Sequence, residues 1–131
     1  MIFIDANFII ALSVKKHDKY DKAIKLWENI ENEEKITSKL VVTEVINVLN
    51  VSLKQNIELT EKVYKFIANN ITILYDHDYH AKAMDYMKLY YPKRLPLNDC
   101  VYMSLMEDLG ITEILSFDNH FDLNKNIKRI Y

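Results

Sequence analysis

Cysteine, glycine and proline are scarce in this sequence, whose 131 residues include one cysteine, one glycine and two prolines. The single cysteine, Cys100, excludes an internal disulfide framework and any zinc site built from paired thiolates. The shortage of glycine and proline leaves few turn residues for the many hairpins of an all-β sandwich or barrel. The composition therefore predicts a helix-rich protein of a reducing compartment, the cytoplasm.

Long hydrophobic runs are also missing. The first apolar run, Ile2–Ile4, is interrupted by Asp5 and Asn7, and no basic segment precedes it, so we expect neither a secretory signal nor a membrane span. The 17 Lys and Arg residues against 19 Asp and Glu residues give a net charge of −2, without the broad positive field of a protein that coats nucleic acid. This balance is still compatible with an enzyme that has a local acidic site.

The hydrophobic fraction of 50% and the charged fraction of 27% predict a single globular domain over residues 1–131. Apolar runs and helical spacings alternate along the chain, which favours an α/β fold with a central, mostly parallel sheet of four to five strands flanked by helices. The expected strands are residues 2–4, 36–38, 71–74, 113–117 and 127–130. The expected helices are residues 7–12, 18–30, 40–53, 58–68, 78–91 and 96–109, the last one capped by Gly110.

Four acidic residues occupy unusual places in this pattern. Asp5 and Asp118 each follow a predicted strand, and parallel strands present their carboxyl ends at one edge of the sheet, where ligands bind. Asp99 lies in the first turn of a helix, where the helix dipole favours an anion, and Glu44 interrupts an apolar helix face. Each also has an ordinary interpretation, as a helix cap, a first-turn acid or a solvated helix edge.

The joint placement of these acids indicates a metal site more strongly than any one of them does. Carboxylates that converge on one sheet edge repel one another unless they are protonated or neutralised by a cation. A site of oxygen ligands alone favours Mg²⁺ or Mn²⁺ over zinc. Such a metal site activates water and stabilises the transition state of phosphoryl transfer.

Four segments, taken in order, resemble the PIN-domain family of metal-dependent ribonucleases, many of which are the toxin halves of VapBC-type toxin-antitoxin pairs. They are Phe3-Ile4-Asp5-Ala6-Asn7, the run from Ser38 to Val45 that contains Glu44, Asn98-Asp99, and Ser116-Phe117-Asp118-Asn119-His120-Phe121. The resemblance covers essentially the whole chain, and all four acidic positions of the family pattern are occupied in order.

The resemblance implies an endonuclease in which Asp5, Glu44, Asp99 and Asp118 bind one or two Mg²⁺ or Mn²⁺ ions and hydrolyse RNA phosphodiester bonds in line. It also implies that Asn7 and Ser116 orient the acids. The implied partners are the RNA substrate, a cognate antitoxin protein and a second copy of the chain in a homodimer. An antitoxin would cover the acidic groove, with an Arg or Lys inserted among the carboxylates.

Two positions depart from the family pattern. Ser116 stands where members more often carry Thr, which keeps the hydroxyl group. His120 stands where many members carry a further Asp, and Asp122 is out of register with that position. This departure implies a second metal that is weaker, or that binds only when RNA supplies phosphate ligands. On its own, His120 has two interpretations: a histidine that tunes the site beside Asp118, or, as is more common, a histidine of a surface turn.

Other polar segments are interpreted as follows. Arg94 is the best individual candidate for an RNA-phosphate contact, because a guanidinium group matches phosphate geometry. The run Asp76-His77-Asp78-Tyr79-His80 resembles a metal cluster, but we interpret it as a polar helix start with Asp76 or Asp78 as the cap. Cys100 is expected to be a buried apolar residue.

Two alternatives to the ribonuclease stay open at this level. One is a PIN fold that has lost activity and serves as an interaction module. The other is a phosphatase-like enzyme that transfers a phosphoryl group through Asp5, although the segment Asp5-Ala6-Asn7 lacks the second acid of the haloacid-dehalogenase motif.

Overall fold

The computed structural model describes residues 1–131 and contains a five-stranded sheet in the order β3-β2-β1-β4-β5, with every pair of neighbouring strands parallel. β1 lies at the centre, and its three residues are all buried. A strand covered on both faces is expected to be an unbroken apolar run, as this one is. The strands are β1 (Ile2–Ile4), β2 (Lys35–Ser38), β3 (Thr72–Leu74), β4 (Glu113–Leu115) and β5 (Lys128–Ile130).

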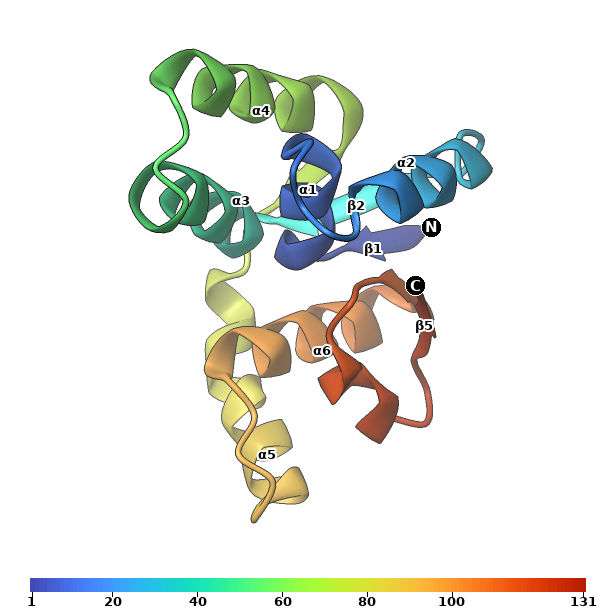
Figure 1. The fold of residues 1–131 in the computed structure, drawn as a ribbon. Coiled ribbons are helices and arrows are strands. Elements are labelled where there is room, and N and C mark those ends of the chain that lie inside the picture. Colours follow the sequence, from blue (N-terminus) through green and yellow to red (C-terminus); the bar gives the residue numbers. More distant parts are fainter.

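Helices cover both faces of this sheet. Figure 1 shows α1 and α4 on one side of β1, and α5 and α6 together on the other. This division is expected, because right-handed crossovers that run toward β3 and toward β5 pass over opposite faces. The α-helices are α1 (Ala6–Ser13), α2 (Tyr20–Asn29), α3 (Lys39–Asn47), α4 (Ile57–Asn70), α5 (His80–Tyr90) and α6 (Leu97–Leu109). Three shorter turns complete the elements: η1 (Val48–Ser52), η2 (His77–Tyr79) and η3 (Asn119–Leu123).

The strand order places β1 where the chain reverses its direction of travel across the sheet. β2 and β3 extend to one side of β1, and β4 and β5 extend to the other. In open parallel sheets this reversal leaves a crevice outside the carboxyl ends of the two central strands, where ligands bind. Here the central strands are β1 and β4. In their register, Phe3 pairs with Ile114 and Ile4 pairs with Leu115. The fold thus brings the residues after Ile4 and after Leu115 to one place.

The predicted fold class and elements are confirmed, with differences at several ends. The expected helix over residues 40–53 is α3 followed by the π-helical turn η1, and the expected helix over 78–91 is the 3₁₀ turn η2 followed by α5. Pro96 precedes α6 rather than lying in its first turn, whereas Gly110 ends the helix in the left-handed conformation, with φ of 69°. Strand β4 ends at Leu115. The backbone N–H of Ser116 still donates to the carbonyl of Ile130 in β5, but those of Phe117 and Asp118 bond to side chains instead of to a neighbouring strand.

The segment Asp76–His80 forms a polar helix start, but the expected cap was wrong. Asp76 does not cap the helix that follows it. Its Oδ2 accepts a hydrogen bond of 2.8 Å from the backbone N–H of Leu40 in the first turn of α3, and its Oδ1 lies 3.1 Å from Nε2 of His80. The chain leaving β3 passes the start of α3, so the carboxylate satisfies a free N–H group there. Cys100 is fully buried, as predicted.

None of the helices is sufficiently long and apolar to cross a membrane.

Candidate active site

Asp5 lies at the junction between β1 and α1 and is only 4% exposed. It caps α1, since its Oδ1 accepts a hydrogen bond of 2.8 Å from the backbone N–H of Ala6. Its Oδ2 accepts a bond of 2.6 Å from Oγ of Ser116, which follows β4. Capping uses one carboxylate oxygen and the contact with Ser116 uses the other. The ordinary interpretation of Asp5 as a cap is therefore correct, and it does not exclude a role in the site.

Asn7 and Ser116 connect the ends of β1 and β4. Oδ1 of Asn7 accepts a hydrogen bond of 3.1 Å from the backbone N–H of Phe117. Oγ of Ser116 donates to Asp5 and accepts a bond of 3.0 Å from the backbone N–H of Asp118. The two side chains thus hold the turn that carries Asp118 against the start of α1.

Asp99, Asp118 and His120 form a tight group beside this turn. Nδ1 of His120 lies 2.9 Å from Oδ2 of Asp99 and 3.1 Å from Oδ1 of Asp118. One ligand atom from each residue lies within 4.8 Å of the others. Asp99 reaches the group from the first turn of α6, and the other two residues come from the loop after β4.

Glu44 faces the site from α3. It is half-buried, and its Oε2 accepts a hydrogen bond of 3.3 Å from the hydroxyl of Tyr102 on α6. Tyr102 is fully buried, with its ring against Phe3 of β1 at a centroid distance of 5.3 Å. Glu44 is therefore more than a solvated helix edge, because a buried donor holds its carboxylate toward the sheet.

The carboxylates influence one another as members of a single cluster. Burial raises the pKa of Asp5 to about 7, against the lowering effect of the Ser116 hydrogen bond, and the charges of Asp99 and Glu44 raise it further. Burial likewise raises the pKa of Asp99 to about 6, and the charge of Asp118 adds to this while the His120 hydrogen bond opposes it. Burial also raises the pKa of Glu44, and the negative charge of Asp118 raises it further.

Burial and like charges both disfavour several ionised carboxylates in this site unless a cation joins them. The donors are carboxylates with one imidazole, and their closest atoms are about as far apart as adjacent ligands in an octahedral site with bonds of about 2.1 Å. The donor set therefore fits a divalent ion such as Mg²⁺ or Mn²⁺.

A family model described as the PIN domain matches residues 2–126. The chain belongs to the PIN domain family. Its PIN domain has no significant match among curated proteins.

Solved structures agree on the fold of this PIN domain. VapC20 of Mycobacterium tuberculosis, described as a Sarcin-Ricin loop cleaving toxin, is 18% identical with a TM-score of 0.84 over 95% of both chains. VapBC2 of Rickettsia felis, bound to a fragment of promoter DNA, is 15% identical with a TM-score of 0.72 over 99% of this chain and 98% of that one. FitAcB of Neisseria gonorrhoeae is 15% identical with a TM-score of 0.68 over 100% of this chain and 97% of that one.

Two basic side chains of this PIN domain lie in a surface pocket that His120 also lines. Lys93 and Arg94, in the loop between α5 and α6, line a surface pocket of about 310 Å³ together with His120 and Leu123. Arg94 is exposed, and its guanidinium lies 5.3 Å from the ring of Tyr91. The pocket adjoins the acidic cluster through His120, which is partly exposed there.

Three residues make contacts in the site that the sequence does not predict. His120 was expected in a surface turn, but its ring points at Asp99 and Asp118. Tyr102 lies one helical turn after Asp99, and that spacing is the only hint that both face the same way. Arg129 of β5 donates two hydrogen bonds to Asp122, at 2.9 and 2.8 Å, and one of 3.4 Å to the carbonyl of Ser116. It thereby braces the loop that carries Asp118.

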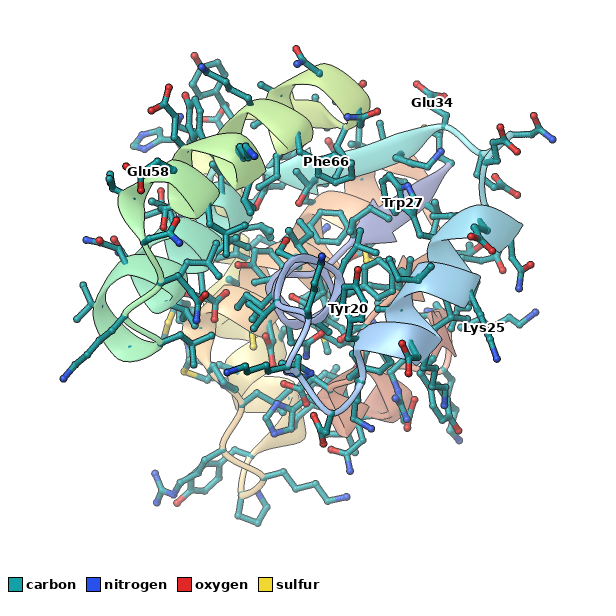
Figure 2. All side chains as sticks on the ribbon, turned by 45° about the horizontal axis from the view of Figure 1, so that its top comes forward. Tyr20, Lys25, Trp27, Glu34, Glu58 and Phe66 are labelled. Carbon is teal, nitrogen blue, oxygen red and sulfur yellow. The ribbon has the colours of Figure 1, made fainter.

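A second surface feature of the PIN domain is an apolar groove between α2 and α4. Trp27 of α2 and Phe66 of α4, both labelled in Figure 2, pack together in it with their ring centroids 5.4 Å apart. The groove has a volume of about 300 Å³, and none of its lining residues belongs to the acidic cluster. The apolar lining residues are Leu12, Ile24, Trp27, Leu59, Val63 and Phe66.

Proposed function

We propose that this protein is a metal-dependent ribonuclease that hydrolyses phosphodiester bonds of RNA with Mg²⁺ or Mn²⁺. The observation that carries the proposal is the grouping of Asp99 and Asp118 with His120 beyond the end of β4, together with the buried Asp5 and half-buried Glu44, whose pKa values are raised in part by the charges of these acids. Membership of the PIN domain family supports this interpretation of the cluster.

The four acids hold the metal in this proposal, and the bound metal supplies activation of water and stabilisation of negative charge on the phosphate. The rest of the chemistry depends on how the chain positions the acids. The Ser116 hydroxyl and the Ala6 N–H group fix both oxygens of Asp5, and Asn7 fixes the turn before Asp118. Because these contacts exist before substrate arrives, little reorganisation is needed during the reaction.

The substrate would approach over the pocket that contains Lys93 and Arg94. A guanidinium group binds a phosphate through paired hydrogen bonds, and Arg94 is free to reach a phosphate next to the cleaved one. We assign these basic residues to holding the RNA backbone and not to the hydrolysis itself.

We further propose that the ribonuclease is the toxin of a toxin-antitoxin pair, acts in the cytoplasm and forms a homodimer. Two of the similar structures are named VapC20, a toxin, and VapBC2. An antitoxin would insert an Arg or Lys among the carboxylates, where a cation is favoured. The apolar groove between α2 and α4 offers a second surface for the apolar face of such a partner.

Cleavage of a mixed pool of structured RNAs tests the proposal. We expect discrete products with Mn²⁺ or Mg²⁺, no products with EDTA, and loss of products in Asp5→Asn and Asp118→Asn. Asp85→Asn provides the matched control, because Asp85 is an exposed acid on α5. Equal cleavage by the parent and both site variants would show that the assigned site is wrong.

The same preparation separates the remaining alternatives. A folded parent that binds no Mn²⁺ at millimolar concentration would indicate an inactive interaction module. Hydrolysis of a generic phosphomonoester that disappears in Asp5→Asn would indicate a phosphatase-like enzyme.

A further inference from the structure

His120 is a nitrogen donor within a site whose other candidate metal ligands are all carboxylate oxygens. Its ring lies between two carboxylates assigned to the metal, with Nδ1 at 2.9 Å from Asp99 and 3.1 Å from Asp118. Nδ1 faces the acids, so the same nitrogen that donates a hydrogen bond there has a lone pair for a metal once it loses its proton.

The loop holds His120 in this orientation from both sides. The backbone N–H of His120 donates a bond of 2.9 Å to Oδ1 of Asp118, which caps the turn η3. The next residue, Phe121, is fully buried in the core. Asp122 is then held by the paired hydrogen bonds of Arg129. The position of the imidazole is therefore set by the fold and not by a freely moving surface turn.

We propose that His120 is a metal ligand through Nδ1, so that the site binds a divalent transition ion such as Mn²⁺ in preference to Mg²⁺. This inference rests on the proposed function, since it concerns the metal of the same site. Its chemical basis is that an imidazole nitrogen suits first-row transition ions, whereas Mg²⁺ prefers oxygen donors alone and gives up its water reluctantly.

The arrangement of the three donors supports direct binding. The two short distances from Nδ1 match the spacing of adjacent ligands in an octahedral site with bonds of about 2.1 Å, so the nitrogen and the two carboxylate oxygens are close enough together to hold one cation. A carboxylate in place of the imidazole would add another negative charge to a cluster whose acids already raise one another's pKa. The neutral nitrogen donor gives the site a ligand without that repulsion.

Electron spin-echo spectroscopy of bound Mn²⁺ provides the test, because it detects nitrogen nuclei bound directly to the ion. We expect nitrogen coupling in the parent, its loss in His120→Asp, and its retention in His77→Asp, which changes an exposed histidine on η2. His120→Asn is the second variant in case the aspartate impairs folding, since it keeps a donor but has no imidazole.

Calorimetric titrations with Mn²⁺ and Mg²⁺ give the second readout. In His120→Asp we expect the preference for Mn²⁺, expressed as the ratio of the two Kd values, to fall roughly tenfold or more. Mn²⁺ bound without nitrogen coupling in the parent, or an unchanged ratio, would overturn the inference and leave the ribonuclease proposal standing. Nitrogen coupling in a protein that cleaves no RNA would support His120 as a ligand and contradict the proposed function instead.

Discussion

Replacing Asp5 by asparagine should stabilise the metal-free protein at alkaline pH. Asp5 is buried and its pKa is raised to about 7, so its charge opposes folding whenever no cation is bound. Asparagine has almost the same shape and stays neutral. Its oxygen can still accept from the Ala6 N–H group, and its amide can donate to Oγ of Ser116, so that both contacts of the native side chain have a replacement.

The sign and size of the effect follow from the two protonation equilibria. The unfolded chain loses the Asp5 proton near pH 3.8, whereas the folded protein retains it to about pH 7. Between these values the folded state binds more protons, so the stability of the parent falls as the pH rises. The difference in pKa corresponds to about 4 kcal/mol of unfolding free energy lost at pH 8, but to only about 1 kcal/mol at pH 4.5.

Urea denaturation of both proteins in EDTA measures this difference. The free energy of unfolding of Asp5→Asn should exceed that of the parent by up to about 4 kcal/mol at pH 8 and by about 1 kcal/mol or less at pH 4.5. Adding Mn²⁺ should stabilise the parent and not the variant, because only the parent binds it. Asp85→Asn, at an exposed position, should show no such pH dependence. A difference that does not change with pH, or a variant less stable than the parent at pH 8, would refute the reasoning.

Three further predictions concern the same site. Asp5 and Asp99, whose pKa values are about 7 and about 6, must lose their protons to bind a metal. The affinity for Mn²⁺ should therefore rise from pH 5.5 to 7.5, and binding should release protons. Calorimetric titrations in two buffers of different ionisation enthalpy measure both effects. Arg129→Met should weaken Mn²⁺ binding and cost about 1 to 3 kcal/mol of stability, because it removes the brace on the loop before Asp118, whereas Lys128→Met should do neither. Tyr102→Phe removes the hydroxyl that donates to Glu44 but keeps the ring in the core. It should lower the free energy of unfolding by about 1 kcal/mol and reduce RNA cleavage. Unchanged cleavage would argue against a role for this contact.

Much of the fold could be predicted from the sequence because its central strand is short, apolar and fully buried. Ile2–Ile4 is this strand, and its end at Asp5 already indicates where the sheet edge lies. Alternation with amphipathic helices then predicts a parallel sheet. The order of the strands is a property of tertiary packing, and the pattern of residues says only that four to five strands exist.

The candidate site was partly predictable for the same reason. Asp5 and Asp118 follow strands, and their positions in sequence place them at one edge. His120 and Tyr102 join the site through contacts between distant elements, at separations of 21 residues for His120 and Asp99 and 58 for Tyr102 and Glu44. No local pattern encodes such contacts. Asp76 shows the same limit, since its partner Leu40 lies 36 residues away, at the start of a different helix from the one it precedes.

The chemistry of the RNA ends tests the central claim most directly. If the acidic cluster and its metal direct water onto the phosphate with the 3′ oxygen as the leaving group, each cut leaves a 3′-hydroxyl on one fragment and a 5′-phosphate on the other. These ends should require Mn²⁺ or Mg²⁺, vanish in Asp118→Asn and persist in Asp85→Asn. Products that end in a 2′,3′-cyclic phosphate, or that form equally in EDTA and in Asp118→Asn, would contradict the account.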